Sequence, residues 1–424
     1  MPNKTPLKTR KTKTANRPGK PKLLLDDPKS AEAIKFYLKL KNISREVQLK
    51  KESYNTLYLC PAGSIIEKFV KLFWNRTDIP LNIVFNSFLV TLGGYLVQQD
   101  LKIMLSAQRL YTNLWILSLG KSAVGKSTIF DFISDYFGDK IAIDEPNYQT
   151  KAAMVDDFSN FPETKRNVLI IDEIAQNIKL FRQAGSQQTL KEAYLNIYGG
   201  KISHTTKRDG KIQISDIFIS IAAGTVISTF QESVTSEDNN DGYLPRFMFS
   251  LANDFERNMK NWPYIWKKTE IKTVQKAFRE YAKKVQGIVE FNVSQKAIAL
   301  LKKYYFEHFN VDLEAHYKRY LWATLKIAGI YNTLLECDGI ISNIDMEWAL
   351  RVIEQNLDSL YQVMDKYLSF NEFEKIIQKV RIFKDDNSES SPRDVMRKLH
   401  LTKQTYETVI NELKARDYLP LEAV

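Results

Sequence analysis

The chain has 424 residues with a hydrophobic fraction of 44%, and its formal net charge at pH 7 is +11. This length exceeds what one hydrophobic core usually organises, so we expect two or three domains in a mostly globular protein. The two cysteines lie too far apart in the sequence for a disulfide framework or a cysteine-based metal site, which fits a reducing cytoplasm. The four histidines lack zinc-binding spacing, so we expect no structural metal. These residues are Cys60, Cys337, His204, His308, His316 and His400.

Residues 1–22 form a basic tail that contains eight lysines and arginines and no acidic residue. Such a segment cannot bury enough apolar surface to fold, so we expect it to be disordered. Two roles fit it equally: salt-dependent, sequence-independent affinity for nucleic acid, or a solubilising or targeting tail. Because no apolar stretch follows it, we expect no secretory signal.

Residues 23–107 are predicted to form a helical N-terminal region. Apolar residues recur at helical spacing in Ala31–Leu40 and in Ile65–Phe73, and Pro61–Gly63 breaks the pattern between them. Ile83–Val97 is the most apolar stretch, but it is short for a bilayer span and contains asparagine, serine, threonine and glycine. We therefore expect a buried helix there and no membrane association.

The pattern changes to alternating strands and helices in residues 108–262. Three short apolar runs are separated by helix-like segments, and each run is followed by glycine or acidic residues. This alternation implies a parallel sheet with a ligand site at the carboxyl ends of its strands. The predicted fold class is therefore α/β. The runs are Asn113–Leu119, Val168–Ile171 and Ile217–Ala223.

Residues 263–369 are predicted to form a helical lid, and residues 370–424 a small separate module. The lid has long amphipathic segments, and the module has three shorter ones, of which the last two are joined tightly. Two short, tightly joined helices resemble a winged helix, which contacts either DNA or protein. The segments are Val293–Phe309, Tyr317–Leu335, Ile344–Tyr367, Phe373–Phe383, Arg393–His400 and Lys403–Ala415.

Gly120–Ser127 matches the pattern G-x-x-x-x-G-K-[ST], directly between a predicted strand and a predicted helix. The glycines let backbone N–H groups surround phosphates, and the helix N-terminus adds its positive dipole. Lys126 is expected to reach the β- and γ-phosphates, and Ser127 to ligate Mg²⁺. The cofactors predicted here are ATP and Mg²⁺. The expected nucleotide contacts are Gly120, Ser122, Ala123, Val124, Gly125, Lys126, Ser127 and Thr128.

Two carboxylates follow the second apolar run, some fifty residues after this P-loop. Asp172 is expected to hold Mg²⁺ through water, and Glu173 to position and polarise the attacking water. Hydrolysis requires a group that neutralises phosphate charge and a group that orients water in the same cleft. The pair therefore predicts an ATP hydrolase.

The order of these motifs resembles that of the AAA+ ATPases, and within them the minichromosome maintenance (MCM) helicases and the helicase-like proteins of plasmids, phages and integrated elements. The resemblance covers residues 110–370 and includes Ala222–Thr225 and Gly242–Phe247. It implies that Thr225 occupies the place of the sensor-1 polar residue, where the family usually has asparagine. It also implies that Arg246 is an arginine finger that reaches the ATP of the neighbouring subunit.

The resemblance further implies a sensor-2 residue and a ring. Arg319, at the start of a predicted helix, is the candidate for sensor 2, and a solvated arginine at a helix end is the alternative. A purely structural arginine is likewise the alternative for Arg246. An arginine finger stabilises charge on the transferred phosphoryl group, and its action on a neighbour implies heterologous contacts that close a ring. In this family the ring implied is a hexamer.

Residues 201–214 contain two alternating, β-branched runs around Asp209-Gly210, which predicts a β-hairpin. Its expected DNA-contacting residues are Lys207, Arg208 and Lys211. In a ring of the implied kind, the family's hairpin at this position projects into the central channel, where a basic tip would bind the phosphate backbone. An exposed hairpin with an ordinary charged turn is the alternative.

The function that these motifs predict is ATP-driven translocation on DNA, with unwinding, by a ring-shaped oligomer in mobile-element replication. We expect single- or double-stranded DNA, further copies of the chain and replication or recombination proteins as partners, in the cytoplasm at the nucleoid. One alternative is an ATP-gated DNA-binding scaffold, such as a helicase loader or transposition regulator, that does not unwind DNA. A protein-remodelling AAA+ machine is the other. The basic hairpin argues against it, because remodellers generally present an aromatic residue there.

Overall fold

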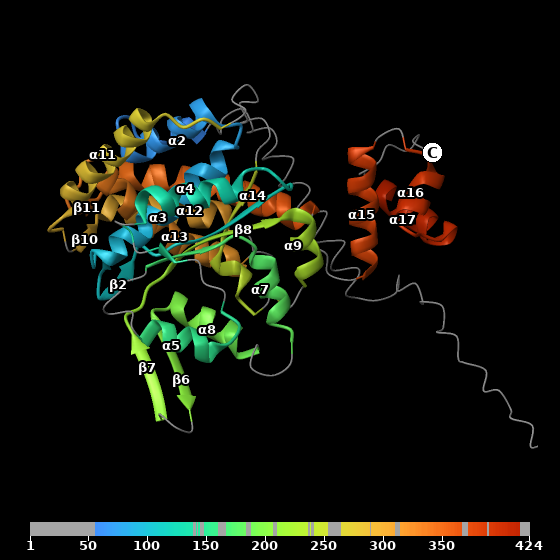
Figure 1. The fold of residues 1–424 in the computed structure, drawn as a ribbon, viewed down its shortest axis with the longest axis horizontal. Helices are drawn as coiled ribbons and strands as arrows, with labels where there is room; N and C mark the ends of the chain where they lie inside the picture. The colour runs from blue at the N-terminus through green and yellow to red at the C-terminus, as the bar shows by residue number, and fades with distance from the viewer. Residues whose placement is uncertain are drawn as a thin grey trace, which may run out of the picture.

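The computed structural model describes residues 56–138, 141, 143–144, 148–159, 167–183, 188–206, 210–235, 238, 241–252, 264–288, 290–309, 314–366, 372–387 and 390–415. The protein is mixed α/β, with helices packed around a parallel sheet and a group of three helices at the C-terminal end (Figure 1). The predicted basic tail, residues 1–22, lies outside the described residues.

The central sheet has five parallel strands in the order β4-β5-β8-β3-β9, which confirms the predicted parallel sheet. Its three inner strands are buried and arise from the three apolar runs of the sequence. β8 begins later than its run and continues through Gly224 and Thr225, because these residues pair with Ser118 and Leu119 of β3. The strands are β3 (Trp115–Gly120), β4 (Ile143–Asp144), β5 (Val168–Ile171), β8 (Ser220–Val226) and β9 (Met248–Leu251).

Helix α3 (Leu81–Gln98) lies against the central sheet and contacts β3, β5, β8 and β9. Gly94 allows this approach, since a Cβ there would lie 2.3 Å from Cγ2 of Val168. Among the residues that the structure describes, α3 alone is long and apolar enough to cross a membrane, but 94% of it is buried inside the protein. The expected buried helix is confirmed.

One hydrophobic core joins the predicted N-terminal region, the sheet and the predicted lid, from Leu59 to Met364. Figure 1 shows α11 (Lys268–Val285) beside α2 and α13 (Glu314–Leu334) beside α3. The other helices that build this body are η2 (Thr56–Leu59), α2 (Ile65–Arg76), α4 (Lys126–Phe137), α5 (Lys151–Ser159), α7 (Ile174–Leu180), α8 (Gln188–Tyr198), α9 (Ile227–Ser233), η3 (Leu244–Arg246), α11 (Lys268–Val285), α12 (Gln295–His308), α13 (Glu314–Leu334) and α14 (Asn343–Lys366).

A second sheet, in the order β11-β10-β1-β2, corrects the expectation that residues 23–107 are entirely helical. β1 comes from that region, and it pairs in parallel with β10 from the predicted lid, with Lys102 opposite Glu290. Residues so distant in sequence pair only once the chain is folded, so helical spacing nearby could not indicate this strand. The strands are β1 (Lys102–Leu105), β2 (Gln108–Tyr111), β10 (Glu290–Val293) and β11 (Ile340–Ile341).

The predicted hairpin is confirmed as β6 (Lys201–Thr206) and β7 (Gly210–Ser215), which pair in antiparallel register. Figure 1 shows it extending away from the central sheet beside α5 and α8. Two of its expected DNA-contacting residues, Lys207 and Arg208, lie outside the described residues. Lys211 belongs to β7.

The C-terminal module has its own hydrophobic cluster, which packs three helices together apart from the main core (Figure 1). The three predicted helical segments are confirmed, and Ser391 starts the second helix with a capping box to Asp394. Within residues 372–387 and 390–415 the module contains no strand, so the wing of a winged helix is not among them. The helices are α15 (Glu372–Asp386), α16 (Pro392–Lys398) and α17 (Lys403–Ala415).

Candidate functional site

As predicted, the glycine-rich loop follows β3 and leads directly into a helix, α4, which begins at Lys126 within the motif. Gly125 precedes the helix with a φ of +91°, a conformation that residues with a side chain rarely adopt. A Cβ there would also lie 2.5 Å from Cγ1 of Ile79, in the segment between α2 and α3. The second glycine of the motif is therefore required by both backbone angle and space, and the N-terminal region packs directly on the loop.

Lys126, at the point where the loop becomes α4, has only 7% of its surface exposed. Its Nζ is 3.5 Å from the carbonyl oxygen of Lys121, which lies at the start of the loop. Burial lowers the pKa of Lys126, and the charges of Asp172 and Glu173 oppose that shift. The predicted lysine and the two predicted carboxylates are thus close enough to interact electrostatically.

The hydroxyl and carboxylate expected at a magnesium site are in contact. Ser127 Oγ donates a hydrogen bond to Asp172 Oδ2 at 2.7 Å, joining the first turn of α4 to the end of β5. Oxygen atoms of this kind are the ligands that Mg²⁺ prefers, and Mg²⁺ usually takes one or two of them together with phosphate oxygens and water. These two residues fit such an ion.

Thr225 and Glu173 are also joined, by a hydrogen bond from the threonine hydroxyl to the carboxylate. β8 lies between β3 and β5 in the sheet, and Thr225 is the residue before its last, so Thr225 lies between the glycine-rich loop and the acidic pair. The two oxygens meet because all three strands are parallel and end at the same edge. The candidate site therefore gathers Lys126, Ser127, Asp172, Glu173 and Thr225.

The two predicted arginines lie elsewhere, at the edge of the sheet where the strands begin. Arg246 precedes β9, whose Met248 pairs with Ile116 near the start of β3. The guanidinium carbons of Arg246 and Arg319 lie 5.4 Å and 5.6 Å from the centre of the Tyr198 ring. At about 3.3 Å per residue, the length of β3 separates them from the glycine-rich loop by roughly 20 Å. Arg246 and Arg319 are thus together, and apart from Lys126 of the same chain.

Lys326 completes this group, and neither Lys326 nor Tyr198 was predicted as a site residue. Lys326 Nζ lies 4.9 Å from the Tyr198 ring centre and donates hydrogen bonds of 2.8 Å to the carbonyl oxygen and Oδ1 of Asn113. No sequence pattern could indicate this group, because its members come from α8, from α13 and from the segment before β9. We call Tyr198, Arg246, Arg319 and Lys326 the cationic cluster.

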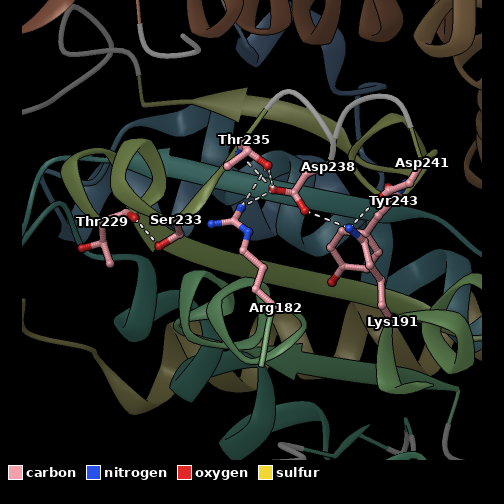
Figure 2. Close-up of polar contacts among 8 residues, drawn as sticks. All are labelled: Arg182, Lys191, Thr229, Ser233, Thr235, Asp238, Asp241 and Tyr243. Atoms are coloured by element: carbon pink, nitrogen blue, oxygen red, sulfur yellow. Dashed lines mark hydrogen bonds and ion pairs between the residues drawn. The ribbon is translucent and has the colours of Figure 1, made fainter. Parts of the chain in front are cut away.

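The segment before Arg246 is fixed by a buried carboxylate, Asp238, which is 2% exposed (Figure 2). Asp238 accepts hydrogen bonds from Arg182, from Lys191 Nζ at 2.8 Å and from the backbone N–H of Thr235 at 2.9 Å. Burial favours a higher pKa for Asp238, but these hydrogen bonds and charges lower it overall. Lys191 also forms an ion pair with Asp241. These contacts fasten the segment to α8 and to the residues that follow α7, the helix directly after Glu173.

Comparison with protein-family models and with curated proteins finds no match for this chain.

Proposed function

We propose that the chain is a Mg²⁺-dependent ATPase of the AAA+ type. The observation that carries this proposal is the convergence of Lys126, Ser127, Asp172 and Glu173 at the carboxyl ends of two parallel strands, β3 and β5, that flank β8. Open α/β sheets bind ligands at this edge, and a glycine-rich turn into a helix suits a triphosphate. The local geometry of Gly125 and the start of α4 support this assignment.

Each residue has a role that follows from its chemistry. Backbone N–H groups from Gly120 to Thr128 would surround the phosphates, and the Lys126 ammonium would neutralise charge on the β- and γ-phosphates. Ser127 and Asp172 would hold Mg²⁺, directly and through water respectively. When bound, Mg²⁺ supplies positive charge that stabilises the transferred phosphoryl group.

Glu173 would orient and polarise the attacking water, and Thr225 would fix the carboxylate that does so. The hydrogen bond between them supports a sensor-1 role for Thr225, because a hydroxyl on the intervening strand can respond to the phosphate and to the base together. A threonine can serve in place of the family's asparagine, since both side chains offer a hydrogen-bond donor at the strand end.

Arg246 would act on the nucleotide of a second copy of the chain. Its place at the opposite edge of the sheet supports this proposal, because it is too far from its own glycine-rich loop. Arg319 lies beside it and would share that role instead of serving as a sensor in its own subunit. A site completed by a neighbour implies a ring, for which we propose a hexamer.

The output that we propose is translocation on DNA and unwinding, in the replication of a mobile element. The hairpin β6–β7 supports it, because it extends away from the core and carries the basic tip sequence Lys207-Arg208. Lys207, Arg208 and Lys211 would bind the phosphate backbone, while the C-terminal module would contact DNA or a partner protein. The first alternative is a scaffold that assembles on duplex DNA without unwinding it. A protein-remodelling machine is a weaker alternative.

Strand displacement on a forked DNA duplex with Mg-ATP tests this function. The wild type should hydrolyse ATP and displace the strand, while Lys126→Ala should lose nucleotide binding and Glu173→Gln should bind nucleotide but not hydrolyse it. Replacing both Lys207 and Arg208 by alanine should keep basal hydrolysis and remove its stimulation by DNA. Tight duplex binding without displacement would favour the scaffold, and failure of the wild type to bind Mg-nucleotide would refute the proposal.

A further inference from the structure

Tyr198, the last residue of α8, is surrounded by three cations. Arg246, Arg319 and Lys326 all lie within 6 Å of its ring centre. A cation is attracted to the negative face of an aromatic ring at this distance. Because a ring has only two faces, at least two of the three cations share one face. Their mutual repulsion therefore works against the attraction of the ring.

No carboxylate in the described part of the chain forms an ion pair with any of the three cations. Burial and the charge of Arg319 lower the pKa of Arg246 to about 10, and Tyr198 and then Asp241 oppose the shift. Arg246 donates a hydrogen bond from Nη1 to the carbonyl oxygen of Gly242, while its buried Nε has no partner among the described residues. The Tyr198 ring is thus the main group that compensates this charge within the described residues.

The exposure of the three cations differs in a way that suggests a direction. Lys326 is 5% exposed and donates a hydrogen bond to the carbonyl oxygen of Asn113, whereas Arg246 and Arg319 are partly exposed. The ring also packs edge-on against Trp115 at the start of β3, with centroids 5.1 Å apart. Tyr198 is therefore held rigidly by the sheet, and the arginines that lie on it can extend toward solvent.

We propose that Tyr198 is a positioning residue that aligns Arg246 and Arg319 as a pair for the phosphates of a nucleotide bound to a second copy of the chain. This inference rests on the proposed ATPase function and adds to it a residue that no motif includes. An anion placed between the two arginines relieves the repulsion between them, so the cationic cluster is poised to bind one. The tyrosine acts through its ring face and touches no nucleotide itself.

The test compares steady-state ATP hydrolysis by full-length Tyr198→Leu, Tyr198→Phe and wild type. Tyr198→Leu removes the ring and should lower kcat about 10-fold to 100-fold, since misplaced catalytic groups cost this much, with KM for ATP within about 2-fold of wild type. Tyr198→Phe keeps the ring face and should stay within about 2-fold of wild type in both constants. A loss in Tyr198→Phe equal to that in Tyr198→Leu would overturn the proposal.

A double-mutant cycle with Arg246→Ala separates positioning from a general loss of stability. In that background Tyr198→Leu should lower kcat by clearly less than it does in the wild type, because one of the two arginines that it positions is absent. The control is Tyr95→Leu, which removes a buried core tyrosine that has no cation on its ring among the described residues. It should lower the melting temperature without the loss of kcat. Multiplicative effects of Tyr198→Leu and Arg246→Ala would overturn the proposal.

Two further outcomes are distinguishable. If the wild type hydrolyses ATP and Tyr198→Leu matches it, this inference fails alone and the ATPase assignment stands. If the wild type binds no Mg-nucleotide, the proposed function and this inference fall together. Should Tyr198→Leu not fold, Tyr198→Met makes the same comparison, because methionine keeps a long apolar side chain without a ring face.

Discussion

Glu173 and Thr225 come from different strands, and only the order of the strands brings them into contact. A hydroxyl that donates to a carboxylate fixes the orientation of that carboxylate and so the direction of the carboxylate's lone pairs. The same carboxylate would have to face the attacking water, so the threonine sets the geometry of the proposed base. Thr225 would therefore act in the proposed reaction through Glu173.

We expect Thr225→Val to lower kcat for ATP hydrolysis about 10-fold, because valine has a similar shape but cannot hold the carboxylate. The KM for ATP should change little, since the glycine-rich loop is intact. Thr225→Ser keeps the hydroxyl and should retain most of the activity. Equal loss in both variants would contradict this role, and steady-state kinetics decides between them.

Lys326 illustrates the cost of a buried cation. Burial, followed by the charge of Arg319, lowers its pKa to about 7, although Asn113 satisfies two of its donors. The unfolded chain holds this proton up to the ordinary pKa near 10.5. Between these values the unfolded state binds more protons than the folded state, so stability rises with pH. Below pH 7 both states are protonated and the full penalty applies.

The free energy of unfolding should therefore increase from pH 7 to pH 9, by at most about 1.4 kcal/mol per pH unit from this group. Lys326→Met removes the titrating group, so its free energy of unfolding should rise less steeply across the same range. Urea unfolding of both proteins at several pH values measures the two slopes. Identical slopes would show that another group is responsible for the pH dependence.

At the scale of elements, the strand, glycine-rich loop and helix were predictable because each is encoded within a dozen consecutive residues. The apolar run to Leu119 forms a buried strand, and the glycines and Lys126 then start the helix where the motif places it. The pairing of β1 with β10 was not predictable, because it joins Lys102 to Glu290. The contact of Ile79 with the glycine-rich loop was not predictable either, because the two are also distant in the sequence.

The packing of α3 on the sheet makes Gly94 the sensitive position of that helix. A Cβ there would lie 2.9 Å from the carbonyl oxygen of Asn167 as well as against Val168. We expect Gly94→Ala to destabilise the fold by about 1–3 kcal/mol, the usual cost of overpacking, despite the higher helix propensity of alanine. Gly199→Ala, where the nearest atom is 3.5 Å away, is the control. Thermal unfolding of the two variants measures the difference.

For the whole molecule, the predicted site residues are divided between the two edges of the central sheet. The sequence predicted the loop, the acidic pair and Arg246 as separate motifs, and the structure adds that the first two meet while the arginine does not join them. No sequence pattern indicated Tyr198 and Lys326, because they become neighbours of Arg246 only through α8 and α13. The motifs thus indicated candidate residues, and the topology decides which of them lie together.

This division predicts complementation between two inactive proteins. Lys126→Ala has an intact Arg246, and Arg246→Ala has an intact glycine-rich loop, so mixed oligomers would contain some complete sites. We expect each variant alone to lose at least about 10³-fold in kcat, the usual cost of removing such a finger. Mixing them in equal amounts should restore a measurable fraction of wild-type hydrolysis. No recovery in oligomers shown to exchange subunits would contradict action between copies.

The pairing of segments that are distant in the sequence also determines the order in which parts of the fold can form during synthesis. The ribosome must add nearly two hundred residues after Lys102 before β10, the parallel partner of β1, exists. At about 5–20 residues per second, that interval lasts roughly 10–40 seconds. During it the most apolar helix has emerged while α13 and α14, its later neighbours in the core, have not been made. In this window α3 lacks those two helices as packing partners, which favours aggregation of the nascent chain.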